Sequence, residues 1–404
     1  MRPQPDVPSL PASGAKAARY ASQRGVAPSA TPDPNRSPRL PVLDGLRGLA
    51  AIGIVLFHLP GLAITPWMFD RFYLLVDVFF LLSGFVMALS AEPRLAAGWS
   101  TTDFMTARVR RLWPTMALGI GLGAIAFLGR YPPSQIVPFA VFALLFLPVL
   151  GTSGLAYPIN GPEWSLTWEL VANLVHALVL RRLSDRTLIV VAAVSGVALA
   201  ITAYEVGCGC AGPNAANWYL AAPRVAWAYT LGIVLARRWR QHAFAPVLDW
   251  KWALAAPMLT LMLLPWLPLT QAQGDTLMTV LVLPGLFWLI CIAKPPEQVS
   301  RGLEKLGAMS FPLYATHPAA LLACGYLGQS KTMLVLGLMA ALGCACVIAW
   351  AASQLKRQRS GAIMRRTDRL GGGPSGQPGP NAFCAAPQAS PPPAHRPHGA
   401  GRPG

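Results

Sequence analysis

The sequence predicts an all-α integral membrane protein, a polytopic helical bundle of about 10–11 transmembrane segments. Two features of composition support this prediction. Apolar residues make up 54% of the 404 residues and charged residues only 12%, against about 25% charged in a typical soluble domain. Apolar runs near the roughly 20 residues that span a bilayer recur through the middle of the chain. These runs are too long and too uniformly apolar for strands of a membrane barrel, so we expect helices.

The two ends of the chain differ from its middle. Residues 1–39 are rich in Pro, Ala, Ser and Arg and are predicted to be a disordered cytoplasmic arm. They lack the apolar core of a signal peptide, so the first membrane segment is expected to direct insertion. Residues 356–404 are basic and rich in Gly and Pro and are predicted to be a disordered cytoplasmic tail. The membrane domain is therefore expected over residues 40–355.

Eleven apolar segments are long enough to be membrane segments, and the short gaps between them carry most of the remaining basic residues. The segments lie near residues 45–65, 72–91, 112–129, 135–151, 164–180, 187–205, 219–236, 250–269, 275–293, 310–327 and 333–354. Basic residues flank the cytoplasmic ends of membrane helices. We therefore expect both termini and the basic gaps at 108–111, 181–182, 237–240 and 294–305 to be cytoplasmic.

This orientation conflicts with the number of segments. Two cytoplasmic termini require an even number of crossings, and the mismatch falls between residues 111 and 181. One segment must therefore be re-entrant, interfacial or no membrane segment at all. The candidate is 135–151, which is followed by the turn-rich stretch GTSGLAYPINGPEW at 151–164. Non-helical backbone at membrane depth is tolerated where it lines a cavity, so this stretch is a candidate cavity wall.

The net charge of +17 does not predict a nucleic-acid-binding protein. The basic residues lie in the tails and in the gaps, and they form no stripe with interleaved aromatic residues. Attraction to anionic lipid is a sufficient reason for the excess. The expected partner of this surface is the lipid bilayer, and no nucleic-acid partner is expected.

The first motif that carries chemistry is LDGLRGLAAIGIVLFHL at 43–59, in which Asp44, Arg47 and His58 interrupt an apolar helix. Arg47 and His58 are separated by about 1100° of helical turn, so they share one face within about 20° and lie about 16 Å apart along the axis. Arginine suits a phosphate or carboxylate, and histidine suits proton transfer. The structural alternative is an arginine that extends to the interface and a histidine satisfied in the core.

Two further groups of polar residues lie in membrane segments or beside them. Asp77 and Ser83 lie in RFYLLVDVFFLLSGF, and a buried Asp77 would need His58 or an arginine as its partner. A solvated carboxylate near the surface is the alternative. Arg108 and Arg111, in RVRRLWP, could hold the phosphates of a nucleotide-containing cofactor, although ordinary cytoplasmic flanking predicts the same residues.

A polar face is predicted on the segment that follows the turn-rich stretch. Glu169, Asn173 and His176 are spaced i, i+4, i+7 and line one side of a helix, with Trp164 at its entry. Such a face points into the bundle or a water-filled cavity, or it holds helices together. A weaker cluster, Tyr314 and His317, lies in MSFPLYATHP; packing is its alternative.

The seven cysteines do not predict a metal centre, and no metal is expected. Cys208 and Cys210 form a CxC pair in a predicted loop, and Cys344 and Cys346 form another in an apolar segment. Neither has the paired CxxC spacing of a zinc site. A loop disulfide and small buried apolar residues are both open readings.

Four of these motifs, in this order, resemble the acyltransferase type 3 family of bacterial integral membrane acyltransferases. LDGLRGLAAIGIVLFH resembles the opening block, with its Arg, ten residues and His. VDVFFLLSGFVM resembles the second block, RVRRLWP the Arg-x-x-Arg signature and WSLTWE the Trp-Ser-Leu-x-x-Glu block. The resemblance covers about residues 40–355. A later block of the family corresponds to SFPLYATH, which departs from the family pattern at Phe311 and Ala315.

The resemblance implies about ten membrane helices in the bacterial inner membrane and transfer of an acyl group from acyl-CoA, with acetyl expected. The acceptor would be a hydroxyl of a glycan, glycolipid or small product, as in O-acetylation of a polysaccharide. By residue, it implies that Arg47 and His58 are the essential pair, followed by Arg108, Arg111 and Glu169.

The expected mechanism follows from these residues. His58 would be the general base, and Asp77 or Glu169 would orient it or balance its charge. Arg47, Arg108 and Arg111 would hold acyl-CoA, with Ser83 and Trp164 also at the donor site; an acyl-His or acyl-Ser83 intermediate is left open. The alternative function is a proton-coupled transporter or flippase of envelope precursors, in which the buried ionisable groups form a proton relay. The sequence has no internal repeat of the kind many transporters show.

Overall fold

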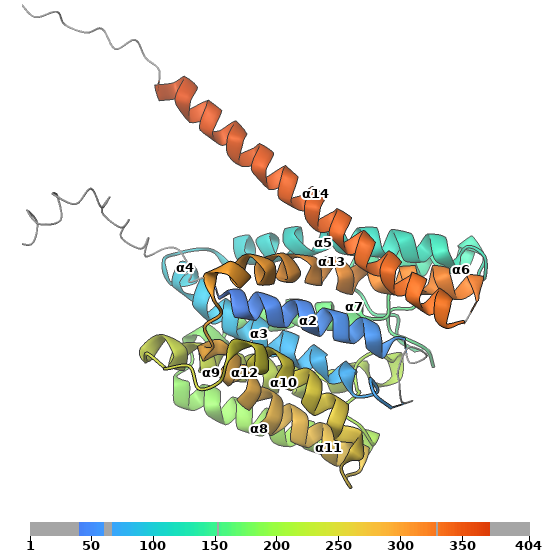
Figure 1. Ribbon diagram of the computed structural model, residues 1–404, viewed down its shortest axis with the longest axis horizontal. Coiled ribbons are helices and arrows are strands. Elements are labelled where there is room, and N and C mark those ends of the chain that lie inside the picture. The colour runs from blue at the N-terminus through green and yellow to red at the C-terminus, as the bar shows by residue number, and fades with distance from the viewer. Residues whose placement is uncertain (1–39, 60–66, 152, 329, 372–404) are drawn as a thin grey trace, which may run out of the picture. The chain divides into compact units, whose positions relative to one another are not determined.

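A computed structural model describes residues 40–59, 67–151, 153–328 and 330–371 (Figure 1). All regular elements in these ranges are helices, and one isolated β-bridge joins Leu155 and Asn214. The predicted arm at 1–39 and the end of the predicted tail at 372–404 lie outside the described residues. The expected all-α membrane fold is confirmed.

The helices follow one another with short connections. In the first half they are α2 (Pro41–Phe57), η2 (Phe72–Leu74), α3 (Leu75–Ser90), α4 (Glu92–Ala96), α5 (Thr101–Phe127), α6 (Pro133–Leu144), α7 (Glu163–Leu178) and η3 (Leu180–Arg182). In the second half they are α8 (Asp185–Val206), η4 (Ala215–Leu220), α9 (Ala221–Gln241), α10 (Trp250–Leu263), η5 (Leu264–Trp266), α11 (Gln271–Leu277), η6 (Met278–Val282), α12 (Leu283–Ile292), α13 (Glu297–Leu327) and α14 (Lys331–Gly371).

Each of the eleven predicted membrane segments overlaps one of these helices. By length and composition, five helical stretches of the described chain could cross a membrane: Phe72–Ser90, Asp185–Val206, Ala215–Gln241, Gln271–Ile292 and Lys331–Leu355. Other helices are shorter, such as α2 with 17 residues, or begin with charged turns, such as α5 and α13. Buried side chains of these shorter and charged helices join the same core.

Helix α6 is too short to cross a bilayer. Its 12 residues extend about 18 Å at 1.5 Å per residue, against a hydrocarbon core of about 30 Å. The chain then turns at Phe146, which has a φ of 56°, and reaches α7 through a non-helical stretch. The segment predicted at 135–151 is thus a short helix followed by a turn.

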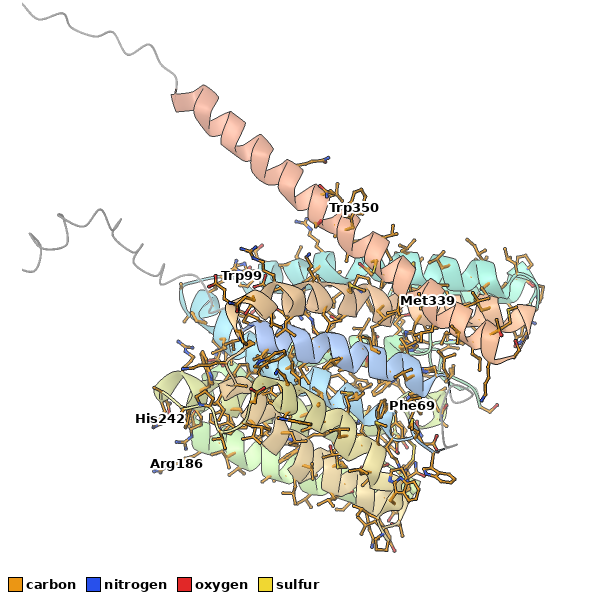
Figure 2. All side chains as sticks on the ribbon, in the orientation of Figure 1. Phe69, Trp99, Arg186, His242, Met339 and Trp350 are labelled. Atoms are coloured by element: carbon orange, nitrogen blue, oxygen red, sulfur yellow. A yellow bond between two sulfur atoms is a disulfide. The ribbon has the colours of Figure 1, made fainter. Side chains whose placement is uncertain are left out.

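The helices place their connections at two ends of the bundle. Trp99 at the start of α5, Arg186 at the start of α8 and His242 after α9 lie at one end in Figure 2, and Phe69 before α3 lies at the other. The first of these ends, which we call the basic end, has many arginines and lysines at the ends of its helices and between them: Arg94, Arg181, Arg182, Arg186, Arg237, Arg238, Arg240, Lys251, Lys294, Arg301 and Lys305.

Close helix contacts hold the centre together. Helix α3 packs along α9, and α2 packs along α13 although they are far apart in sequence (Figure 1). A Cβ added at Gly84 of α3 would lie 2.0 Å from the carbonyl oxygen of Tyr229, and one added at Gly48 of α2 would lie 2.3 Å from Leu306. Small residues at such points let helices in a membrane approach closely.

Helix α14 extends past residue 356, where the predicted tail begins. Residues up to Ala351 form one compact unit and residues from Ala352 form another, and α14 continues into the second unit as far as Gly371. A helix already nucleated in an apolar segment propagates through residues of good helical propensity. The disorder of the tail stays a prediction.

Candidate functional site

A cavity of about 490 Å³ opens at the end of the bundle away from the basic end. Its walls come from the end of α2, the segment before α3, the turn-rich stretch before α7, the loop before η4, and helices α9, α11 and α13. They include Ile54, Phe57, His58, Asp70, Arg71, Tyr73, Val76, Leu155, Gly161, Pro162, Trp164, Cys210, Pro213, Arg224, Gln271 and Tyr314. The predicted wall formed by residues 151–164 is therefore present.

His58 lies at the cavity wall, where α2 ends. Pro60 follows two residues later, and the residue before a proline disfavours helical backbone. The Nδ1 atom of His58 lies 2.8 Å from the carbonyl oxygen of Ile54. A carbonyl only accepts hydrogen bonds, so in the neutral ring Nδ1 carries the proton. The Nε2 atom then has a free lone pair, the form a general base needs.

His317 of α13 is the neighbour of His58. Its Nε2 atom lies 3.4 Å from Nδ1 of His58, and its own Nδ1 lies 3.0 Å from the carbonyl oxygen of Tyr314. That carbonyl is available because Pro318, four residues on, has no N–H to donate. His317 therefore keeps its proton on Nδ1 and presents an Nε2 lone pair to His58. His317 is fully buried and does not line the cavity, so it lies behind His58 as seen from the cavity.

The turn-rich stretch fixes this part of α13. The Tyr314 hydroxyl lies 2.7 Å from Ser165 Oγ and donates to the carbonyl of Pro162 at 3.1 Å. The side chain of Asn160 donates to the carbonyl of Ala315 at 3.0 Å. The late block that departs from the family pattern thus contributes His317 and Tyr314 to the site.

Asp77 pairs with an arginine that the sequence analysis did not single out. Arg224 of α9 donates from Nε and Nη2 to the two carboxylate oxygens of Asp77 at 2.7 and 2.8 Å, and both residues are buried. Arg224 also lies over the ring of Trp164, 5.5 Å from its centroid. The partner of Asp77 is therefore the alternative arginine, and Asp77 does not orient His58.

Arg224 reaches the cavity because of this pair. Its Nη2 donates to the Tyr73 carbonyl at 3.1 Å and its Nη1 to the Ala211 carbonyl at 3.3 Å. An arginine within the predicted apolar segment 219–236 is rare enough to mark a site, and this signal could have found it. Trp164, predicted at the donor site, lines the same cavity as Arg224.

A second cluster lies nearer the basic end. Arg47 forms an ion pair with Asp44 at 3.1 Å and donates to Ser310 Oγ at 2.8 Å and to the Gly307 carbonyl at 2.7 Å. Since Arg47 and His58 both contact α13, the prediction that they share one face of α2 is confirmed. Their separation of about 16 Å keeps them in different clusters.

Arg108, Glu169 and Ser83 belong to this second cluster. Arg108 Nη2 donates to Glu169 Oε1 at 2.5 Å, and Ser83 Oγ donates to the same oxygen at 3.1 Å. Arg111 interacts electrostatically with these charges and with Arg47. The predicted donor-site arginines thus lie together. Glu169 contacts Arg108 and Ser83, and the expected contact between Glu169 and His58 is not what the structure shows.

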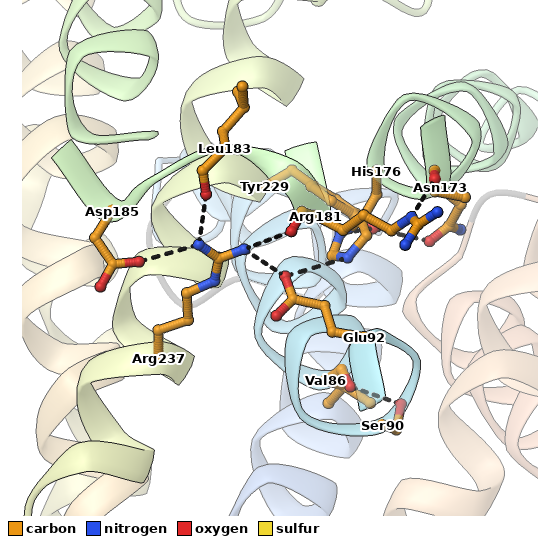
Figure 3. A network of polar contacts seen from close by, with 11 residues as sticks. Val86, Ser90, Glu92, Asn173, His176, Arg181, Leu183, Asp185, Tyr229 and Arg237 are labelled. Atoms are coloured by element: carbon orange, nitrogen blue, oxygen red, sulfur yellow. Dashed lines mark hydrogen bonds and ion pairs between the residues drawn. The ribbon is translucent and has the colours of Figure 1, made fainter. Parts of the chain in front are cut away.

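The rest of the polar face of α7 joins a network at the basic end (Figure 3). The Tyr229 hydroxyl lies 3.0 Å from Asn173 Oδ1 and 3.3 Å from His176 Nδ1. Arg237 contacts Glu92 at 2.9 Å and Asp185 at 3.0 Å. His176 also lies 3.6 Å from Glu92, so the network ties α4, α7, α8 and α9 together, which is the structural alternative for Asn173 and His176.

The far wall of the cavity contains a third group. Asp275 of α11 accepts a hydrogen bond from the Tyr73 hydroxyl and another from the Gly209 N–H at 2.8 Å, and it lies 3.7 Å from Arg71. Gly209 lies between Cys208 and Cys210, which form a disulfide. Of the two readings of this CxC pair, the disulfide is confirmed. In the described part of the chain, no group of metal-binding side chains is present.

The described helices thus form a membrane bundle with His58 at a cavity, the buried His317 beside it and a separate arginine cluster. The family model Acyl_transf_3, described as an acyltransferase domain, matches residues 40–353. The chain belongs to this acyltransferase family, and the predicted membership is confirmed.

Two relatives show how the match extends along the chain. "Protein 2 in picA locus" of Rhizobium radiobacter is 35% identical over 190 residues, which cover 41% of this chain and 96% of that protein. "Putative membrane-bound transacylase BcsY" of Komagataeibacter xylinus is 27% identical over 304 residues, which cover 70% of this chain and 74% of that protein. No solved structure matches.

Proposed function

We propose that this membrane acyltransferase moves an acyl group, with acetyl expected, from acyl-CoA to a hydroxyl of a carbohydrate or another cell-envelope or exported molecule. The observation that carries the proposal is the 2.8 Å contact between His58 Nδ1 and the Ile54 carbonyl oxygen at the cavity wall. The Nδ1 proton of His58 is held by Ile54, so Nε2 is free to take a proton at the cavity wall. A positioned base of this kind contributes about 10²–10⁴-fold.

The proposed reaction uses His58 twice. Nε2 takes the proton of the acceptor hydroxyl as its oxygen attacks the thioester carbonyl, and the carbon–sulfur bond then breaks. The proton passes from His58 to the leaving sulfur, so that coenzyme A departs as a thiol. The oxygen–acyl bond formed replaces the sulfur–acyl bond lost, and no further reactant is needed.

The donor and the acceptor are proposed to bind at different places in the bundle. The phosphates of acyl-CoA are proposed to bind Arg47, Arg108 and Arg111, because guanidinium groups bind phosphate by several directed bonds. The pantetheine arm would then bridge the distance of about 16 Å from Arg47 to His58. The cavity at the other end is proposed to take the acceptor. Its polar side chains, such as Asp70, Arg71 and Gln271, can hydrogen-bond hydroxyl groups.

Thiol release from acetyl-CoA tests this function. Purified protein in liposomes is given acetyl-CoA and a range of glycans, and wild type is compared with His58→Ala. His242→Ala is the matched control, because His242 is exposed at the basic end. We expect His58→Ala to lower release by about 10²–10⁴-fold and the control to behave as wild type. Normal turnover by His58→Ala would remove His58 from the mechanism. Failure of every short acyl-CoA would favour the transporter function.

We further propose that the basic end faces the cytoplasm of a bacterial inner membrane. The excess of arginine and lysine at that end supports this orientation, and so does the disulfide near the cavity, since disulfides persist in oxidising compartments. The test uses Asp70→Cys and Arg240→Cys, each in a background without other reactive thiols. A membrane-impermeant maleimide applied to whole spheroplasts should label Asp70→Cys alone, and labelling of Arg240→Cys alone would reverse the orientation.

A further inference from the structure

A second pocket, of about 300 Å³, lies beside the cavity that contains His58. It is formed by the end of α5, by α6 and by the segment at 155–159. Phe127, Ile136, Phe139 and Ile159 make its apolar lining. Pockets that bind a hydrocarbon chain need such a lining, because the favourable free energy comes from apolar surface removed from water.

Leu155 is common to the two spaces. It lines both the second pocket and the His58 cavity. Its backbone is fixed by the β-bridge with Asn214, and the next residue, Ala156, donates to the carbonyl of Pro213 at 2.8 Å. A molecule that extends past the Leu155 side chain could therefore occupy both spaces at once.

The second pocket opens where a membrane lipid could enter. Tyr131 and Gln135 line it and are exposed, and tyrosine is enriched where the bilayer meets water. Val137 and Val141 of α6 are also exposed, at 58% and 47%, as expected of a helix whose outer side meets lipid. Because α6 is short, it separates the second pocket from the bilayer over only part of the depth of the pocket.

We propose that the second pocket binds the hydrocarbon chain of an amphiphilic acceptor whose hydroxylated head group lies in the His58 cavity. This inference rests on the proposed acyl transfer and names the class of acceptor. A volume of about 300 Å³ holds a chain of roughly ten carbon atoms, if each takes the ~30 Å³ of a water molecule in the liquid.

The acyl chain of the donor is the rival occupant. The donor reaches His58 from the arginine cluster nearer the basic end, so its acyl chain would have to pass His58 and Leu155 before it reached the pocket. The chain of an acceptor enters directly from the bilayer beside Tyr131. The direction of approach therefore favours the acceptor.

Photolabelling can identify the molecule that occupies the second pocket, and it does not require acyl transfer. The probe is octyl β-D-glucoside with a diazirine at the end of its alkyl chain, applied to the full-length protein in nanodiscs. We expect labelled peptides from residues 127–139 and 155–159. Unlabelled octyl β-D-glucoside at ten times its dissociation constant should reduce this labelling about tenfold, and methyl β-D-glucoside should not. Phe139→Trp, which fills the pocket, should abolish the competed labelling.

Labelling of lipid-facing surface provides the control. Val194 of α8 is 64% exposed, so peptides around it should be labelled without competition, and Val194→Trp should leave the pocket labelling unchanged. Uncompeted labelling of the pocket would overturn the proposal, and so would competition by decanoyl-CoA but not by octyl glucoside. Because labelling needs no turnover, loss of the proposed acyl transfer is recognised separately by the absence of thiol release.

Turnover gives a second readout. With alkyl β-D-glucosides from methyl to octyl as acceptors, kept below their micelle concentrations, KM of the wild type should fall by up to about fourfold per added methylene. This dependence on chain length should disappear in Phe139→Trp and persist in Val194→Trp. A KM that does not change with chain length in the wild type would overturn the proposal.

Discussion

Replacement of His317 by leucine should lower turnover much less than replacement of His58. His317 accepts a long hydrogen bond of 3.4 Å from His58 Nδ1, whereas the Ile54 carbonyl accepts from the same nitrogen at 2.8 Å. In His317→Leu the Ile54 bond remains and keeps the proton on Nδ1. One hydrogen bond contributes about 0.5–1.5 kcal/mol, so kcat should fall about 2–13-fold at 1.36 kcal/mol per factor of ten.

The assay is steady-state thiol release, with kcat and KM measured separately for each substrate. Since His317 is fully buried behind His58, we expect KM to be unchanged. His317→Gln, whose amide oxygen can accept the Nδ1 proton, should recover part of the loss. Thr316→Val is the matched control, because Thr316 bonds only the carbonyl of Pro312 in the same helix. A loss in His317→Leu as large as in His58→Ala would show that His317 itself transfers protons and would refute this reasoning.

Two further predictions concern stability, measured by thermal unfolding in detergent. Arg224→Met leaves the carboxylate of Asp77 buried without its partner and should lower the free energy of unfolding by about 3–5 kcal/mol. The double variant with Asp77→Asn should recover much of this loss. An unchanged melting temperature in Arg224→Met would contradict the pairing. Gly84→Ala places a methyl group 2.0 Å from a backbone oxygen of α9 and should cost about 1–3 kcal/mol. Gly121→Ala, which meets no atom within 4 Å, should cost nothing, and equal effects would contradict the packing.

The fold was largely predictable because hydrophobicity is a local property of the chain. Each long apolar run contains helix, and the parity of the basic gaps singled out the segment that holds the short helix α6. The length of α14 was not predictable in this way. A rule based on charge and glycine content places the boundary at residue 356, but a helix that has nucleated in an apolar segment can propagate through polar residues of good helical propensity, as α14 does to Gly371.

For the site, only relations between residues of the same segment were predictable. The spacing of Arg47 and His58 placed both on one face of α2, since helical periodicity alone determines that relation. The partner of a side chain depends on which helices pack together, and this information is not local. Asp77 illustrates the limit, because Arg224 lies 147 residues away and His58 was an equally good partner by chemistry.

The packing of α2 against α13 explains how the protein keeps two separate clusters of polar side chains in register. Arg47 bonds Gly307 and Ser310 on α13, and His58 contacts His317, seven residues further along the same helix. Leu306 approaches Gly48 so closely that a Cβ there would clash at 2.3 Å, which prevents the helices from sliding. The distance from the proposed phosphate site to the proposed base is therefore set by helices, whereas half of the residues that line the His58 cavity, the proposed acceptor site, lie outside helices. Such a division would let acceptors vary between relatives while the donor geometry stays the same, because loops change more readily than packed helices.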